Sequence, residues 1–134
     1  CMIVLDTHAL IWWVNGDSKL SARARKVIES EMTVDGGKIL VSAITAWEIA
    51  MLVNKNRLVL TMDLNEWLDT VRSIDAVQFV PIDNEVAVQS VQLPGDFHPD
   101  PADRMITALA RHYSAMLVTS DDKIRNYRHV KTIW

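Results

Sequence analysis

The sequence has little of what marks several protein classes. It contains one cysteine, Cys1, so no disulfide can form within the chain, and this favours a reducing compartment. The longest apolar runs, such as residues 9–14, fall far short of the roughly 18 residues that a membrane span needs. No charged-then-apolar signal segment is visible near the start. We therefore expect a cytoplasmic protein with no membrane partner.

Several catalytic motifs are also missing. No glycine-rich phosphate-binding loop, dinucleotide-binding fingerprint or Gly-x-Ser-x-Gly turn occurs, which disfavours nucleotide hydrolysis, dinucleotide redox chemistry and hydrolase chemistry. There is no cluster of Cys and His that suits zinc. The formal net charge of -3 argues, taken alone, against a general nucleic-acid binder.

The 134 residues and the 49% apolar content fit one globular domain, over residues 2–134. Short apolar runs rich in β-branched residues alternate with segments of helical periodicity. This order predicts an α/β fold with a mostly parallel central sheet and helices on both faces. We expect strands at 2–5, 38–41, 77–80, 115–118 and 130–133, and helices at 7–14, 21–31, 45–54, 63–74, 83–92, 102–113 and 121–127.

Acidic residues follow the strands or begin the helices at four places in this pattern. They are Asp6, Glu48, Asp103 and Asp121, with Asp100 and Asp122 as alternatives for the last two. Parallel sheets place such positions along one edge, where ligands bind. Each acid also has a simpler interpretation as a helix cap, including a capping box in residues 45–48. Taken singly, capping is favoured for every one of them.

Taken together, the acids point to a hard cation. Converging carboxylates repel one another, and a divalent ion relieves that repulsion. Mg²⁺ and Mn²⁺ prefer carboxylate oxygens and water. Acid clusters of this kind serve phosphoryl transfer and nuclease chemistry, in which the metal activates water.

Four segments carry a resemblance to a known family. Residues 5–10, 42–49, 100–106 and 117–121 together resemble the PIN-domain family, most closely its VapC-type toxin ribonucleases, and the likeness covers nearly the whole chain. The resemblance implies an endoribonuclease that depends on Mg²⁺ or Mn²⁺. It implies Asp6 and Asp103 as main metal ligands, with Glu48 and Asp121 binding directly or through water. It also implies a cognate antitoxin and a homodimer.

Further residues are candidates for supporting roles. Thr7 and Thr119 resemble hydroxyl groups that support metal ligands, although capping explains them equally well. Arg104 is a candidate for RNA contact or a structural ion pair. The other candidate RNA contacts are Arg23, Arg25, Lys26, Lys55, Arg57, Arg125 and Arg128, each also explained as part of a solvated surface.

Aromatic residues have simpler expected roles. Trp47 and Trp67 are expected in the core. Surface or packing roles are favoured for the four histidines, with a general-base role for His8 as the alternative. Two other functions remain open for the whole chain: a structure-specific DNA nuclease of related fold, and a non-catalytic module that binds a partner through an acidic pocket.

Overall fold

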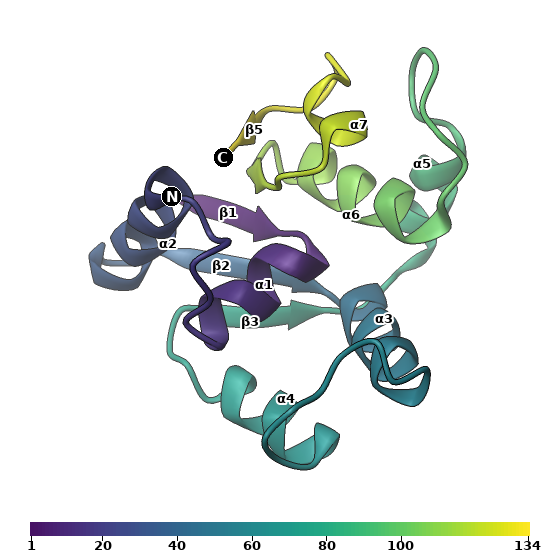
Figure 1. Ribbon diagram of the computed structural model, residues 1–134. Helices are drawn as coiled ribbons and strands as arrows, with labels where there is room; N and C mark the ends of the chain where they lie inside the picture. The colour runs from purple at the N-terminus through teal and green to yellow at the C-terminus, as the bar shows by residue number, and fades with distance from the viewer.

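The computed structural model describes residues 1–134 and contains five strands and seven helices (Figure 1). The strands are β1 (Met2–Leu5), β2 (Lys38–Ser42), β3 (Val77–Val80), β4 (Met116–Val118) and β5 (Thr132–Ile133). The helices are α1 (Thr7–Val14), α2 (Ala22–Thr33), α3 (Ala43–Asn54), α4 (Leu64–Arg72), α5 (Asn84–Val91), α6 (Pro101–His112) and α7 (Asp122–Arg125). The predicted alternation of strands and helices is confirmed.

The five strands form one parallel sheet in the order β3-β2-β1-β4-β5. Strand β1 is central, with Val4 opposite Leu40 on one side and Leu117 on the other. Strands β2 and β3 lie on one side of β1, and the later strands β4 and β5 lie on the other side. At such a reversal of strand order, the carboxyl ends of the central strands open a crevice.

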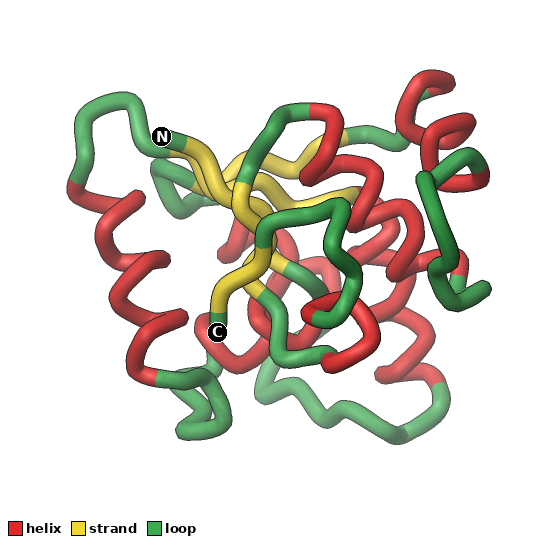
Figure 2. Tube along the Cα trace, turned by 90° about the horizontal axis from the view of Figure 1, so that it is seen from above, coloured by secondary structure: helices red, strands yellow, loops and turns green.

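Alternation along the strands divides the core into two layers. Ile3 and Leu5 of β1 pack under α1 to α4, whereas Val4 packs on the opposite face under α5 to α7. Strand β2 repeats the pattern, because Ile39 and Val41 join the first layer and Leu40 the second. Figure 2 shows the strands in the middle of the molecule with helices on both sides. The expected three-layer α/β arrangement is therefore confirmed, and the all-parallel sheet is more regular than predicted.

Several elements begin or end two residues away from the predicted boundary, and the start of α3 is one of them. This helix begins at Ala43, two residues before the predicted start, because the Ser42 hydroxyl accepts a hydrogen bond from the Ile44 amide at 3.2 Å and caps the helix. None of the seven helices combines the length and the apolar character that a membrane-spanning helix requires.

The two tryptophans predicted in the core have different environments. Trp67 is 3% exposed, and its indole N–H donates to Asn15 Oδ1 at 3.3 Å. Trp47 is 56% exposed, so the prediction was wrong for this residue. Helix α3 turns Ile49 into the core, and a residue two positions away lies on the far side of a helix with 3.6 residues per turn.

Candidate functional site

A pocket of about 410 Å³ lies at the carboxyl edge of the sheet, where the predicted acids meet. Nine residues line it: Asp6, Thr7, His8, Trp12, Glu48, Asp100, Asp103, Ser120 and Asp121. Five of them are acids, and none is lysine or arginine. We call this the acidic pocket.

Asp6 lies at the bottom of the acidic pocket because β1 ends directly before it. One carboxylate oxygen caps α1 by accepting a hydrogen bond from the Ala9 amide at 2.8 Å. The side chain is buried, and burial raises the pKa of Asp6 to about 6 from its usual 3.8, although hydrogen bonds from Thr119 and Ala9 favour the charged form. Capping and a place in the pocket are therefore compatible.

Glu48 reaches the pocket from the second turn of α3. Because α3 begins at Ala43, the capping box considered for residues 45–48 does not form. The Glu48 carboxylate instead accepts a short hydrogen bond from the Thr7 hydroxyl, which also lies 3.2 Å from the hydroxyl of Thr45. Burial raises the pKa of Glu48, and the bond from Thr7 opposes that rise.

Asp100 and Asp103 both face the pocket from the start of α6, and they differ in environment. Asp100 is exposed and caps α6 by accepting from the Asp103 amide at 3.0 Å. Asp103 is more buried, and it feels the charges of all the other acids of the pocket. Burial, followed by those four negative charges, raises the pKa of Asp103 to about 7 from its usual 3.8. The stronger electrostatic coupling favours Asp103 as the third acid.

Asp121 lines the pocket beyond β4, whereas its neighbour Asp122 does not. Asp121 caps α7 by accepting from the Lys123 amide at 2.8 Å, and its own amide donates to the buried Thr119 hydroxyl oxygen at 3.1 Å. The Asp122 side chain is 87% exposed and lies 3.9 Å from Arg125. The geometry therefore favours Asp121 over Asp122 as the fourth acid.

His98 lies next to the acidic pocket, although it was not among the predicted site residues. Its Nε2 atom lies 3.2 Å from Asp103 Oδ2 without forming a hydrogen bond. A signal was present, because the loop that holds His98 runs directly into α6 and must therefore reach the same sheet edge. His8, the candidate general base, is exposed at the rim of the pocket with its ring 5.6 Å from that of Trp12.

Arg104 points away from the acids, although it follows Asp103 in the chain. Its guanidinium donates to the backbone carbonyls of Ser90, Phe97 and His98 at 2.9 to 3.2 Å. Since these donors are already used, the arrangement favours a structural role that fixes the loop before α6 over the expected contact with RNA.

The donor set of the acidic pocket suits a hard divalent cation. Five carboxylates line the pocket, no lysine or arginine does, and the pKa of three of the acids is raised. No three of these groups yet converge on a single point in the way a completed ligand set does.

Comparisons with known proteins identify the family and the fold. A family-wide sequence model described as PIN domain matches residues 3–130. The chain is 34% identical over 134 residues to Ribonuclease VapC22 of Mycobacterium tuberculosis, covering 98% of each protein.

Solved structures share the fold at lower sequence identity. VapBC2 from Rickettsia felis, bound to a DNA fragment from its promoter, matches with a TM-score of 0.72 and 16% identity, over 99% of this chain and 98% of that one. FitAcB from Neisseria gonorrhoeae matches with a TM-score of 0.68 and 20% identity, over 99% of this chain and 97% of that one.

Proposed function

Because the chain belongs to the PIN domain family and is similar along nearly its whole length to a VapC ribonuclease, we propose that it is a metal-dependent endoribonuclease. In this proposal it hydrolyses RNA phosphodiester bonds with water as the nucleophile. The observation that carries the proposal is the acidic pocket, in which five carboxylates meet without a lysine or arginine.

In this proposal Asp6 and Asp103 are the main ligands of Mg²⁺ or Mn²⁺, with Glu48 and Asp121 as direct or water-mediated ligands. The bound ion supplies a water molecule of lowered pKa and neutralises charge on the phosphate. Thr7 supports this arrangement by donating to Glu48 and fixing one of its oxygens. Thr119 links two acids, because it bonds with Asp6 and accepts from the Asp121 amide.

Charge explains why the site needs a cation before RNA enters. A phosphodiester approaching five carboxylates meets like charge. With a pKa of about 7, Asp103 is partly protonated near neutral pH in the absence of an ion. Since a carboxylate would hold a cation in its deprotonated form, metal affinity should rise with pH through this range.

The proposed partner is an antitoxin protein. Support comes from proteins of the same fold, which include a toxin–antitoxin complex from Klebsiella pneumoniae and a member of the VapBC family of toxin–antitoxin systems from Mycobacterium tuberculosis. The protein therefore acts as the toxin of such a pair. We also expect a homodimer, and light scattering of the purified chain measures this directly.

The experiment is an RNA cleavage assay with a matched substitution. The purified chain is incubated with total RNA, single-stranded DNA and duplex DNA in Mg²⁺ or Mn²⁺, with and without EDTA. Asp6→Asn should abolish cleavage, whereas Asp122→Asn, the same chemical change at an exposed residue outside the pocket, should leave it unchanged.

The substrates separate the competing functions. Discrete cuts in RNA alone that EDTA prevents support the proposal. Faster cleavage of DNA indicates the nuclease of related fold, and inertness toward all three substrates indicates a binding module. If Asp6→Asn cuts RNA as fast as the unchanged chain, the role given to Asp6 is wrong.

A further inference from the structure

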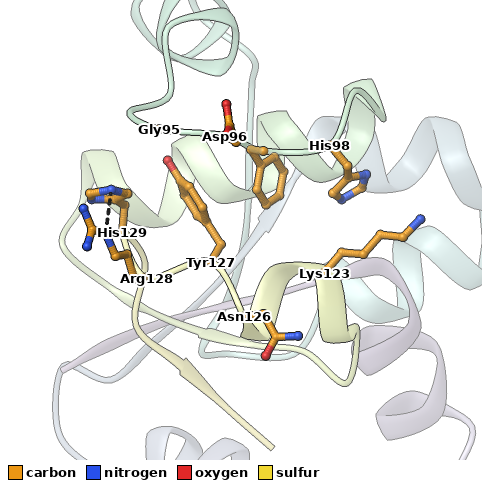
Figure 3. Close-up of a pocket in the computed structure, with 9 residues that line it drawn as sticks. Gly95, Asp96, His98, Lys123, Asn126, Tyr127, Arg128 and His129 are labelled. Atoms are coloured by element: carbon orange, nitrogen blue, oxygen red, sulfur yellow. Dashed lines mark hydrogen bonds between the residues drawn. The ribbon is translucent and has the colours of Figure 1, made fainter.

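A second pocket, of about 490 Å³, lies beside the acidic pocket and has the opposite electrostatic character (Figure 3). The loop before α6 forms one wall, and α7 with the segment that follows it forms the other. The lining residues are Gly95, Asp96, Phe97, His98, Lys123, Asn126, Tyr127, Arg128 and His129. We call this the basic pocket.

Two links join the basic pocket to the acidic pocket. His98 lines the basic pocket and lies 3.2 Å from Asp103 of the acidic one. Lys123 also lines it, and the Lys123 amide donates to the carboxylate of Asp121, another acid of the site. A ligand in the basic pocket is therefore next to the carboxylates.

The wall of the basic pocket is a continuous series of aromatic rings. The ring of Phe97 lies 4.6 Å from that of His98 and 4.7 Å from that of Tyr127, which in turn lies 5.3 Å from that of His129. The buried Tyr127 is anchored from behind, because its hydroxyl donates to the carbonyl of Pro94. These contacts give a rigid surface of rings inside a polar rim, in which neighbouring ring planes are inclined to one another by 42° to 60°.

A cationic side chain stands at each end of that surface. Lys123 lies at one end near His98, and Arg128 lies at the other near His129, whereas the Asp96 carboxylate is turned away from the rings (Figure 3). Lys123 and Arg128 are exposed, and neither forms an ion pair. Their charges are therefore available to a ligand.

The loop of the basic pocket is held in place by groups already described. Arg104 donates to the carbonyls of Phe97 and His98, and its guanidinium lies 5.8 Å from the centre of the Phe97 ring. Gly95 has a φ of +67°, a conformation that glycine adopts at no steric cost, so the chain can turn sharply beside His129. The pocket is preorganised, which reduces the entropic cost of binding.

We infer that the basic pocket binds one nucleotide of single-stranded RNA next to the scissile phosphate, an inference that rests on the proposed function. A nucleic-acid strand alternates anionic phosphate with a flat, apolar base. The pocket presents the complementary order, with a cation, a surface of rings and a second cation. Lys123 and Arg128 each contact a phosphate, and the nucleoside between them packs on the aromatic wall.

This assignment explains how a chain of net charge -3 binds a polyanion. The negative charge is concentrated in the acidic pocket, and the adjacent basic pocket holds the strand at positions on one side of the cut. A duplex is disfavoured, because paired bases are stacked on one another and cannot also pack on the rings.

The first test measures binding without cleavage. A fluorescent single-stranded RNA of about ten nucleotides is titrated into the Asp6→Asn chain in chelator, and anisotropy gives Kd. Adding Lys123→Ala and Arg128→Ala should raise Kd about tenfold and lower the salt slope of log Kd by about two, one for each lost phosphate contact.

The control removes the same charge elsewhere. Arg72→Ala with Lys38→Ala, at exposed positions at the end of α4 and the start of β2, should change Kd by no more than about twofold. Equal effects of the two pairs would overturn the inference, since net charge alone would then explain the loss. The inference would also be overturned if the chain with Lys123→Ala and Arg128→Ala bound RNA normally and no longer bound an oligoglutamate peptide. That result would assign the pocket to an acidic protein.

The second test locates the nucleotide and separates this inference from the proposed function. Uncharged methylphosphonate linkages are placed singly beside the cleavage site of an RNA substrate. At one position, the uncharged linkage should raise KM for the protein without substitutions. The same linkage should change KM little for the chain with Lys123→Ala and Arg128→Ala. If neither the linkages nor the two substitutions affect cleavage, the inference about the basic pocket is wrong, whereas the proposed ribonuclease activity is supported. Binding that depends on the pocket, without cleavage, overturns the ribonuclease alone.

Discussion

Replacement of Asp6 by asparagine should make the protein more stable while it destroys the proposed activity. In the folded chain the pKa of Asp6 is about 6, against 3.8 for an ordinary aspartate. Folding therefore favours the protonated form. The stabilising contribution is complete below the unfolded pKa and is lost as pH rises through about 6. Near neutral pH and above, the charged carboxylate destabilises the fold.

The size of this cost follows from the shift in pKa. A rise of about two units corresponds to about 3 kcal/mol, which is an upper bound because the pocket relaxes. Asparagine carries no charge and still caps α1, since its oxygen accepts the Ala9 amide as well as aspartate does. We expect Asp6→Asn to gain about 1–3 kcal/mol at pH near 8 in EDTA, or a rise in Tm of about 5 °C.

Thermal unfolding of the two chains measures this effect at two pH values. The gain should be present near pH 8 and absent near pH 4, where Asp6 is largely protonated in the folded state. Adding Mg²⁺ or Mn²⁺ should raise the Tm of the unchanged chain and have much less effect on Asp6→Asn. Asp122→Asn serves as the control, with no change in either condition. A variant that is less stable than the unchanged chain near pH 8, or equally stabilised at both pH values, refutes the reasoning.

Further substitutions test three other features of the structure. Thr7→Val removes the donor to Glu48 and should cost about 1–3 kcal/mol in urea unfolding, with much of the loss recovered when Glu48→Gln is added. Arg104→Ala removes the donor to the carbonyls of Phe97 and His98 in the loop and of Ser90 in α5. It should speed hydrogen exchange at residues 95–98, with a cost of about 2 kcal/mol; unchanged exchange contradicts the structural role. Trp67→Ala should cost about 3–5 kcal/mol and Trp47→Ala less than about 1, and similar losses contradict the assigned burial.

The order of the elements was predictable because it depends on local pattern. Apolar runs of four or five residues gave the strands, and β1 and β3 were predicted with their observed boundaries. The start of α3 was missed because two capping residues compete there, and packing against the sheet decides in favour of Ser42 over Thr45. Trp47 was misplaced for a related reason, since a helix that is apolar on several sides does not reveal which side faces the core.

The sequence predicted that the acids lie at one edge of the sheet. It did not predict which of them interact electrostatically in a shared pocket. Strand ends place Asp6 and Asp121 at one edge, and that much follows from a parallel sheet. The choice of Asp103 over Asp100 and of Asp121 over Asp122 depends on burial and on the direction of each side chain. The members of each pair are only three residues and one residue apart, so the sequence does not reveal these differences.

The sequence by itself determined an α/β chain with acids at the carboxyl edge of its sheet, because strand and helix periods and the positions of capping residues are local properties. Only the tertiary structure decided which carboxylates share a pocket, that Arg104 fixes a loop, and that His98, Lys123 and Arg128 line a second pocket beside the first. Those properties depend on contacts between segments far apart in the chain, and burial and charge act through distance in space rather than distance in sequence.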